Sequence, residues 1–239
     1  SDDFNPYDSI YCENGFYRLI NGKPLHDHEK HKFLTIEDIL VHSSNIGISK
    51  IADSFTELSI YKTLKRFGFG SRTYLPLSNE MDGQIRSVNN WSKTSKHYIS
   101  IGQELSITNI QLAMAYSVIA NDGFLVEPHI IKHITKNGDS TYQSSRRIIR
   151  NVLDKKISRK VLYMLQEVVN RGTAESINLN GYHIAGKTGT AQKYKDGDYS
   201  TYIATFASIF PVNNPEYVMI VSIDEPAYGK HWANLSAVP

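Results

Sequence analysis

The sequence contains a single cysteine, Cys12, among its 239 residues. One thiol excludes an internal disulfide and any site built from several thiolates, and it is compatible with reducing and oxidising compartments alike. No apolar run approaches the roughly 18 residues needed to span a bilayer. The first residues, SDDFNPYDSI, also lack the charged-then-apolar pattern of a signal peptide. These absences predict a polypeptide that folds in water.

Long blocks of like charge are missing as well. The chain has 26 Lys and Arg against 24 Asp and Glu, a net charge of +2, and the two signs are interspersed. Without a basic stripe, nothing indicates binding to nucleic-acid phosphates. Hydrophobic residues make up 41% and aromatic residues 11%, which excludes a disordered chain and is enough for one substantial core.

Helix signals dominate residues 31–172. Side chains that can accept a hydrogen bond from a free backbone N–H stand before apolar runs, and glycines follow several of these runs. The predicted caps are Thr35, Ser44 or Asn45, Thr108 and Ser158, and the last two helices are predicted to end at Gly123 and Gly172. A shorter helical stretch, SIYKTLKR, precedes Gly68 and Gly70, and residues 71–100 are predicted to be mostly loop.

Strand signals come in two forms. Asn-Gly pairs predict hairpins that turn at Asn21 and Gly22 and at Asn137 and Gly138. In the last third, YHIAGKTGTAQK, TYIATFASIFPV and EYVMIVSIDEP are rich in β-branched and aromatic residues, which predicts three consecutive antiparallel strands. No repeat or linker divides the chain. We therefore predict one α+β unit over residues 1–239, an antiparallel sheet flanked by helices.

Lys187 stands between small residues in IAGKTGTAQK. Taken alone, the stretch is compatible with a solvated lysine at a turn or strand end. The run GYHIAGKT also has the spacing of a phosphate-binding loop, but such a loop opens a helix and a strand-like run follows here. We therefore disfavour a phosphate site.

A second motif, HSSN, lies at the junction between two predicted helices. It places Ser43 and Asn45 in a Ser-x-Asn arrangement, part of which helix capping explains. Together with Lys-Thr-Gly-Thr on a strand, Ser-x-Asn supplies two of the three signature elements of the penicillin-interacting serine enzymes.

The chain resembles the transpeptidase domain of class B penicillin-binding proteins, particularly the division-type enzymes of the FtsI kind. Six blocks follow that family's pattern in order and cover nearly the whole sequence: YRLINGKPLHDH, LTIEDILVHSSNIGISKIA, LKRFGFGSRTYLPL, SIGQELSITNIQLAMAYSVIANDG, MLQEVVNRGTAESINLNGYHIAGKTGTAQK and YIATFASIFPVNNPEYVMIVSIDEP. The resemblance implies the fold shared by these proteins and the serine β-lactamases. It also implies acyl transfer, in which a serine attacks the D-alanyl-D-alanine end of a peptidoglycan stem peptide and is acylated by β-lactams.

The resemblance implies roles for the two motifs. Ser43 would relay a proton near the leaving amine, and Asn45 would donate its amide to a substrate carbonyl while holding the nearby lysine in place. Lys187 would hydrogen-bond Ser43 and supply positive potential.

The residues that follow Lys187 would bind the substrate. Thr188 and Thr190 would present hydroxyls to its terminal carboxylate, and the backbone N–H of Thr190 would form one arm of an oxyanion hole. Gly189 would let the substrate lie along the strand edge. We expect neither a cofactor nor a metal.

The third motif, Ser-x-x-Lys, carries the family's nucleophile upstream of Ser-x-Asn, and this sequence has no candidate there. The one match, Ser59 to Lys62 in SIYK, lies downstream, and we interpret it as a surface turn of helix. We therefore expect a fragment of a transpeptidase that is inactive on its own, does not form an acyl-enzyme with penicillin and is prone to self-association. The resemblance places the parent protein at the periplasmic face of the bacterial inner membrane, with divisome membrane proteins as partners.

Two other functions remain open from the sequence. A β-lactamase or β-lactam sensor would share both motifs, although no deacylating carboxylate motif lies near Asn45. A non-catalytic module that recognises D-Ala-D-Ala or β-lactams would explain the missing nucleophile.

Several smaller features complete the expectations. Glu104 stands where the family usually has Gly, and we expect a solvated side chain; Asn109 stands where it tends to have Pro. HDHEKH contains His26, His28 and His31 but no zinc-binding spacing, so we interpret it as a polar surface loop. Cys12 has no recognisable histidine arrangement around it and is interpreted as a bystander.

Overall fold

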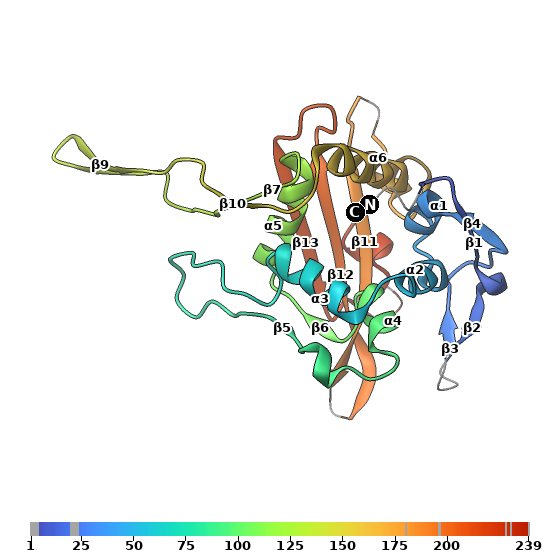
Figure 1. Ribbon diagram of the computed structural model, residues 1–239. Coiled ribbons are helices and arrows are strands. Elements are labelled where there is room, and N and C mark those ends of the chain that lie inside the picture. The colour runs from blue at the N-terminus through green and yellow to red at the C-terminus, as the bar shows by residue number, and fades with distance from the viewer. Residues whose placement is uncertain are drawn as a thin grey trace.

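The structure is a computed structural model that describes residues 5–19, 24–179, 181–195, 197–227, 229 and 231–238. Its centre is an antiparallel sheet in the order β11-β12-β13 (Figure 1). The three strands are β11 (Ala185–Lys195), β12 (Asp198–Phe210) and β13 (Tyr217–Asp224). In the register, Lys187 is paired with Ala207, and Phe206 with Val221. The prediction of three consecutive antiparallel strands is confirmed.

Two long helices pack beside this sheet, α5 (Asn109–Ala120) and α6 (Lys155–Arg171) (Figure 1). One face of α6 is apolar and buried. Val168 and Val169 pack around Phe206 of β12, while Leu162 and Leu165 pack with Ala185 and Ile209. Burial of each such side chain contributes on the order of 1.5–3 kcal/mol, so this interface is the main hydrophobic core.

The N-terminal part forms small strand pairs and two helices. They lie on one side of β11, and a projecting hairpin of residues 133–143 lies on the other (Figure 1). The pairs are β1 (Ser9–Tyr11) with β4 (Phe33–Thr35) and β2 (Phe16–Arg18) with β3 (Pro24–His26); the helices are α1 (Ile36–Val41) and α2 (Asn45–Ala52), and a 3-10 helix covers Glu13–Gly15. The β2–β3 pairing confirms the first predicted hairpin, although Asn21 and Gly22 lie outside the described residues.

Side chains cap the starts of three of the predicted helices. Thr35, Ser44 and Thr108 each accept a hydrogen bond from the backbone N–H three residues on, as predicted. In return, the side-chain carbonyl of Gln111 accepts a hydrogen bond from the backbone N–H of Thr108, which completes a capping box. Each such cap contributes about 1 kcal/mol to helix stability.

The middle of the chain is less regular. It contains α3 (Glu57–Arg66), α4 (Ser95–Ser100), 3-10 helices at Val88–Asn90 and Glu175–Ile177, and the pairs β5 (Gln84–Ile85) with β6 (Leu105–Ser106) and β7 (Phe124–Val126) with β10 (Ile148–Asn151). The prediction of loop is correct for most of residues 71–100 but misses α4. The second predicted hairpin is confirmed as β8 (His133–Lys136) and β9 (Asp139–Gln143), an arm that projects from the body (Figure 1).

The predicted start of α6 is wrong. The helix begins at Lys155, after Asp154, so Ser158 lies inside its first turn. The buried Ser158 hydroxyl instead donates to the backbone carbonyl of Ile119, 2.7 Å away at the end of α5. A hydroxyl can cap a helix or bind a neighbouring carbonyl, and tertiary packing selects the second role here.

The two departures from the family pattern have local explanations. Glu104 has a φ of 58°, a left-handed conformation that favours glycine. Glu104 is exposed, as expected, and its carboxylate also accepts from Ser95 Oγ at 2.6 Å and pairs with Arg86. Asn109 is the first residue of α5, where proline is favoured, and its Oδ1 accepts from Ser222 Oγ on β13 at 2.9 Å.

A short helix, α7 (Ala233–Ser236), packs against β11 and β12. In the parts of the chain that the structure describes, no helix combines the length and the apolar character needed to cross a bilayer.

Two glycines on β11 provide a matched test of the packing. A Cβ on Gly186 would lie 2.5 Å from Cζ of Phe206, whereas a Cβ on Gly189 would have nothing closer than a carbonyl oxygen at 4.0 Å. We expect Gly186→Ala to lower the free energy of unfolding by about 1–3 kcal/mol, because the ring must shift within a packed core. Gly189→Ala should leave it unchanged or slightly higher. Urea denaturation of both variants checks this, and equal effects would contradict the packing described.

Candidate functional site

Two segments far apart in the sequence meet at the edge of the central sheet. Ser43 occupies the junction between α1 and α2, and Lys187 lies on β11. The Lys187 ammonium donates to Ser43 Oγ at 2.8 Å and to the backbone carbonyl of Thr188 at 3.0 Å. The structure therefore brings together the two motifs that the sequence singled out.

The α1–α2 junction has a constrained backbone. Ser43 has a φ of 55°, and its backbone N–H donates to the carbonyl of Leu40. A left-handed conformation costs a residue with a side chain on the order of 1 kcal/mol, and such strain gathers at functional positions. The exposed Ser43 side chain is thereby directed toward β11 while its neighbour Ser44 is buried.

Asp27 holds the start of α2 in place. Its carboxylate accepts from the Ser44 hydroxyl at 2.6 Å and from the backbone N–H of Ile46 at 2.9 Å. A carboxylate at a helix N-terminus also interacts favourably with the helix dipole. The motif residues on either side of Ser44 are therefore held by a half-buried polar contact.

The side chain of Asn45 is anchored at the end of β3. Its side-chain amide donates to the backbone carbonyl of His26, 2.9 Å away at the end of β3. In the described part of the chain no hydrogen bond joins Asn45 to Lys187. The amide retains a second N–H and its carbonyl oxygen, which remain available to a ligand.

The other residues of the strand motif are arranged along β11. Thr188 Oγ1 lies 2.7 Å from Thr173 Oγ1, and Thr190 Oγ1 accepts from the backbone N–H of Ala233 at 3.1 Å. Gly189 between them is exposed. Thr188 and Thr190 are two residues apart and thus share one face of the strand.

Thr173 is a site residue that the sequence analysis missed. It follows Gly172 at the end of α6, and a Cβ on Gly172 would lie 2.6 Å from the backbone carbonyl of Val41. That close approach brings the end of α6 to the end of α1, where the backbone N–H of Thr173 reaches the same carbonyl at 3.4 Å. The local signal was the Gly-Thr pair directly after a helix stop, but only the fold shows which strand it faces.

An ion cluster holds α6 against α1. Arg171 donates to Glu37 at 2.5 Å, to Asp38 at 2.7 Å and to Glu167 at 2.8 Å. Burial alone would raise the pKa of Asp38, but hydrogen bonds from Arg171 and Thr35 bring that pKa below its usual value. Glu37 is buried, so loss of Arg171 would leave an uncompensated carboxylate in the interface.

The Lys187 ammonium sits in an unusual electrostatic environment. Burial lowers the pKa of Lys187 from 10.5 to about 8. Within the described residues its side chain contacts a hydroxyl and a carbonyl, and no ion pair joins it to a carboxylate. A cation held without a counter-ion is suited to bind an anionic ligand.

The remaining sequence candidates lie elsewhere. Ser59 and Lys62 are exposed on α3, as expected for a surface turn of helix. Cys12 is fully buried, and burial raises the pKa of its thiol, which agrees with a bystander role.

The three histidines of HDHEKH, interpreted from the sequence as one polar surface loop, each contact a different aromatic ring. The ring of His26 contacts Phe16, that of His28 contacts Trp232, and that of His31 contacts His42.

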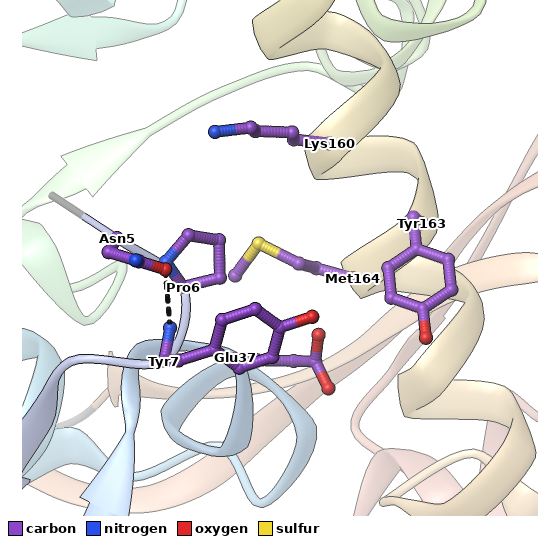
Figure 2. Close-up of a pocket in the computed structure, with 7 residues that line it drawn as sticks. All are labelled: Asn5, Pro6, Tyr7, Glu37, Lys160, Tyr163 and Met164. Atoms are coloured by element: carbon purple, nitrogen blue, oxygen red, sulfur yellow. Dashed lines mark hydrogen bonds between the residues drawn. The ribbon is translucent and has the colours of Figure 1, made fainter. Parts of the chain in front are cut away.

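A cavity of about 190 Å³ lies between the N-terminal segment and α6 (Figure 2). Figure 2 shows the side chains of Tyr7, Lys160 and Met164 around it. None of its lining residues belongs to the Ser43–Lys187 site. We place the functional site at the open edge of β11 because its polar groups converge there.

Comparisons with known proteins agree with one another. The family described as "Penicillin binding protein transpeptidase domain" matches residues 4–237. The probable peptidoglycan D,D-transpeptidase PbpC of Pseudomonas aeruginosa is 33% identical over 227 residues, which are 93% of this chain and 38% of that protein. The peptidoglycan D,D-transpeptidase FtsI of Escherichia coli K12 is 32% identical over 223 residues, which are 92% of this chain and 36% of that protein.

Solved structures show the same likeness. The transpeptidase domain of Burkholderia pseudomallei penicillin-binding protein 3 superposes with a TM-score of 0.88 at 30% identity, covering 100% of this chain and 70% of that one. Penicillin-binding protein 3 of Mycobacterium tuberculosis in complex with ampicillin superposes with a TM-score of 0.86 at 32% identity, covering 94% of this chain and 52% of that one. The chain spans less than half the length of the curated relatives it matches.

The lowered pKa of Lys187 predicts a pH-dependent contribution to stability. Between about pH 8 and pH 10.5 the unfolded chain binds a proton that the folded chain releases, so the free energy of unfolding should rise with pH in this window. Lys187→Met removes the group. We expect the stability of the native chain relative to this variant to increase from pH 7 to about pH 9.5, as measured by urea denaturation.

Lys136→Met on the exposed β8–β9 arm is the control, and its difference from the native chain should not change with pH in this way. A flat difference for Lys187→Met over the same window would contradict the buried state of the ammonium.

Proposed function

Because the chain belongs to the penicillin-binding protein transpeptidase domain family, we propose that it carries the substrate-recognition and proton-relay part of a peptidoglycan D,D-transpeptidase site. The single observation that supports this most strongly is the 2.8 Å hydrogen bond between Lys187 and Ser43, residues 144 apart in the sequence. The chemistry is serine acyl transfer, in which an acyl-enzyme forms with loss of the terminal D-alanine and is then resolved by an amine of a second stem peptide.

Ser43 relays the proton in this proposal. Its hydroxyl already accepts from Lys187 and keeps its own proton to donate to a leaving amine. With its pKa lowered to about 8, the Lys187 ammonium can return a proton to Ser43 more readily than an ordinary lysine. Asn45, anchored through His26, directs its remaining polar groups to the substrate amide.

The edge of β11 binds the substrate chain. In the part of the chain that the structure describes, β11 has β12 as its one partner strand, so a peptide can pair with the opposite edge. Thr188 and Thr190 supply hydroxyls for the terminal carboxylate, and Lys187 supplies the positive charge. The exposed Gly189 removes the side chain that would block this approach, and the backbone N–H of Thr190 contributes to the oxyanion hole.

The attacking serine is outside this set of residues. No Ser-x-x-Lys precedes Ser43 in the 239 residues, and the match at Ser59–Lys62 lies exposed on α3. We therefore assign to this chain the stabilisation of the substrate and of the transition state, but not the covalent step itself.

The substrate and setting follow from the same proposal. The substrate is a stem peptide ending in D-Ala-D-Ala, and β-lactams bind as its mimics. Two relatives named as transpeptidases and a relative solved with ampicillin support this class of ligand. The protein would act on the cell wall at the periplasmic face of the inner membrane, in division, with membrane proteins of the divisome as partners.

Labelling with a fluorescent penicillin tests the proposal. In the full-length product of the gene we expect covalent labelling. Lys187→Met should slow the labelling by about 100-fold or more, because the penicillin loses the positive charge that stabilises its carboxylate and its reacting carbonyl group. The 239-residue chain alone should show no covalent band.

Lys62→Met is the matched control, because Lys62 is exposed on α3 and should leave the labelling rate unchanged. A full-length product that takes no label, or one labelled equally fast with Lys187→Met, would refute the proposed function. A stable band on the 239-residue chain would refute the assignment of the nucleophile to other residues.

A further inference from the structure

Three side chains with metal-binding atoms converge beside the α1–α2 junction. Glu29 and His31 lie in the loop between β3 and β4, and His42 caps the C-terminus of α1. Glu29 Oε2 is 3.1 Å from His31 Nε2 and 3.5 Å from His42 Nδ1. All three ligand atoms lie within 4.8 Å of one another. Two imidazoles therefore point at one carboxylate oxygen.

These spacings fit a small tetrahedral cation. Zinc binds histidine nitrogen and carboxylate oxygen at about 2.0–2.1 Å, which places neighbouring ligand atoms of a tetrahedron about 3.3–3.4 Å apart. The separations of Glu29 Oε2 from the two histidine nitrogens, 3.1 and 3.5 Å, bracket that value, and the two nitrogens lie within 4.8 Å of each other. The His31 and His42 rings are neighbours, tilted against each other with centroids 4.7 Å apart, so both can contribute a nitrogen to one centre.

The donor set favours zinc over calcium or magnesium. Two imidazole nitrogens and one carboxylate are preferred by zinc, whereas calcium and magnesium prefer oxygen ligands only. The side chains of His31 and His42 are 25% and 29% exposed, so an ion can enter from solvent and keep a water as its fourth ligand.

We propose that Glu29, His31 and His42 form a zinc site with one position open to water. This inference is independent of the proposed function. The ion would join the β3–β4 loop to the end of α1, one residue before Ser43, and so fix the segment that carries the Ser-x-Asn motif. Binding to the folded chain alone would also stabilise the fold.

Metal titration of the untagged 239-residue chain tests the site. We expect isothermal titration calorimetry with ZnCl₂ to show saturable binding at a ratio of one ion per chain, and the melting temperature to rise with zinc concentration. Co²⁺ bound at the same site should give the intense visible absorption of a four-coordinate ion. His31→Gln and His42→Gln should each weaken binding by about 100-fold or more, because loss of outer-shell contacts alone costs about 10–100-fold.

His133→Gln, in the exposed β8–β9 arm, is the matched control and should bind like the native chain. Circular dichroism without metal should show all three variants to be folded, so that weaker binding reports a lost ligand. If the native chain shows no one-to-one zinc binding, or if His42→Gln binds as tightly as His133→Gln, the proposed site is wrong.

Discussion

The contact between the ends of α1 and α6 is the constraint on which the site depends. Gly172 lets the backbone of α6 approach the carbonyl of Val41, and Arg171 ties α6 to two carboxylates of α1. The same turn carries Thr173, whose hydroxyl contacts Thr188 on β11. The contact between α1 and α6 therefore positions both the α1–α2 junction and the edge of β11. A movement of α1 along α6 would separate Ser43 from Lys187 and would also disturb the core of the sheet, since Val41 of α1 packs in the same cluster as Phe206.

The predictions that succeeded rest on interactions within a few residues. The caps at Thr35, Ser44 and Thr108 and the β8–β9 turn follow from local backbone chemistry, which a sequence displays directly. The prediction of a helix cap at Ser158 failed because its hydroxyl donates to the backbone carbonyl of Ile119, 39 residues away. Glu104 is exposed as expected, but its contacts with Ser95 and Arg86 join positions 9 and 18 residues away, which the local sequence does not show.

The site shows the same division between local and long-range information. The resemblance to a family placed Ser43 and Lys187 together, which periodicity alone could not have done across 144 residues. Thr173 and the grouping of Glu29 with His42 were beyond reach, because neither has a motif of its own. The histidines that were adjacent in HDHEKH point to different neighbours, so sequence proximity was a poor guide to which side chains meet.

The hydroxyl pair of Thr173 and Thr188 gives the strand edge a direction. Each hydroxyl has one proton, so in a bond of 2.7 Å one threonine donates and the other accepts. When Thr173 donates, the proton of Thr188 is free to face a carboxylate; when Thr188 donates, it has none to offer. An anionic ligand therefore selects the first orientation. Its negative charge polarises the hydrogen bond from Thr173, which follows the end of α6, to Thr188 on β11.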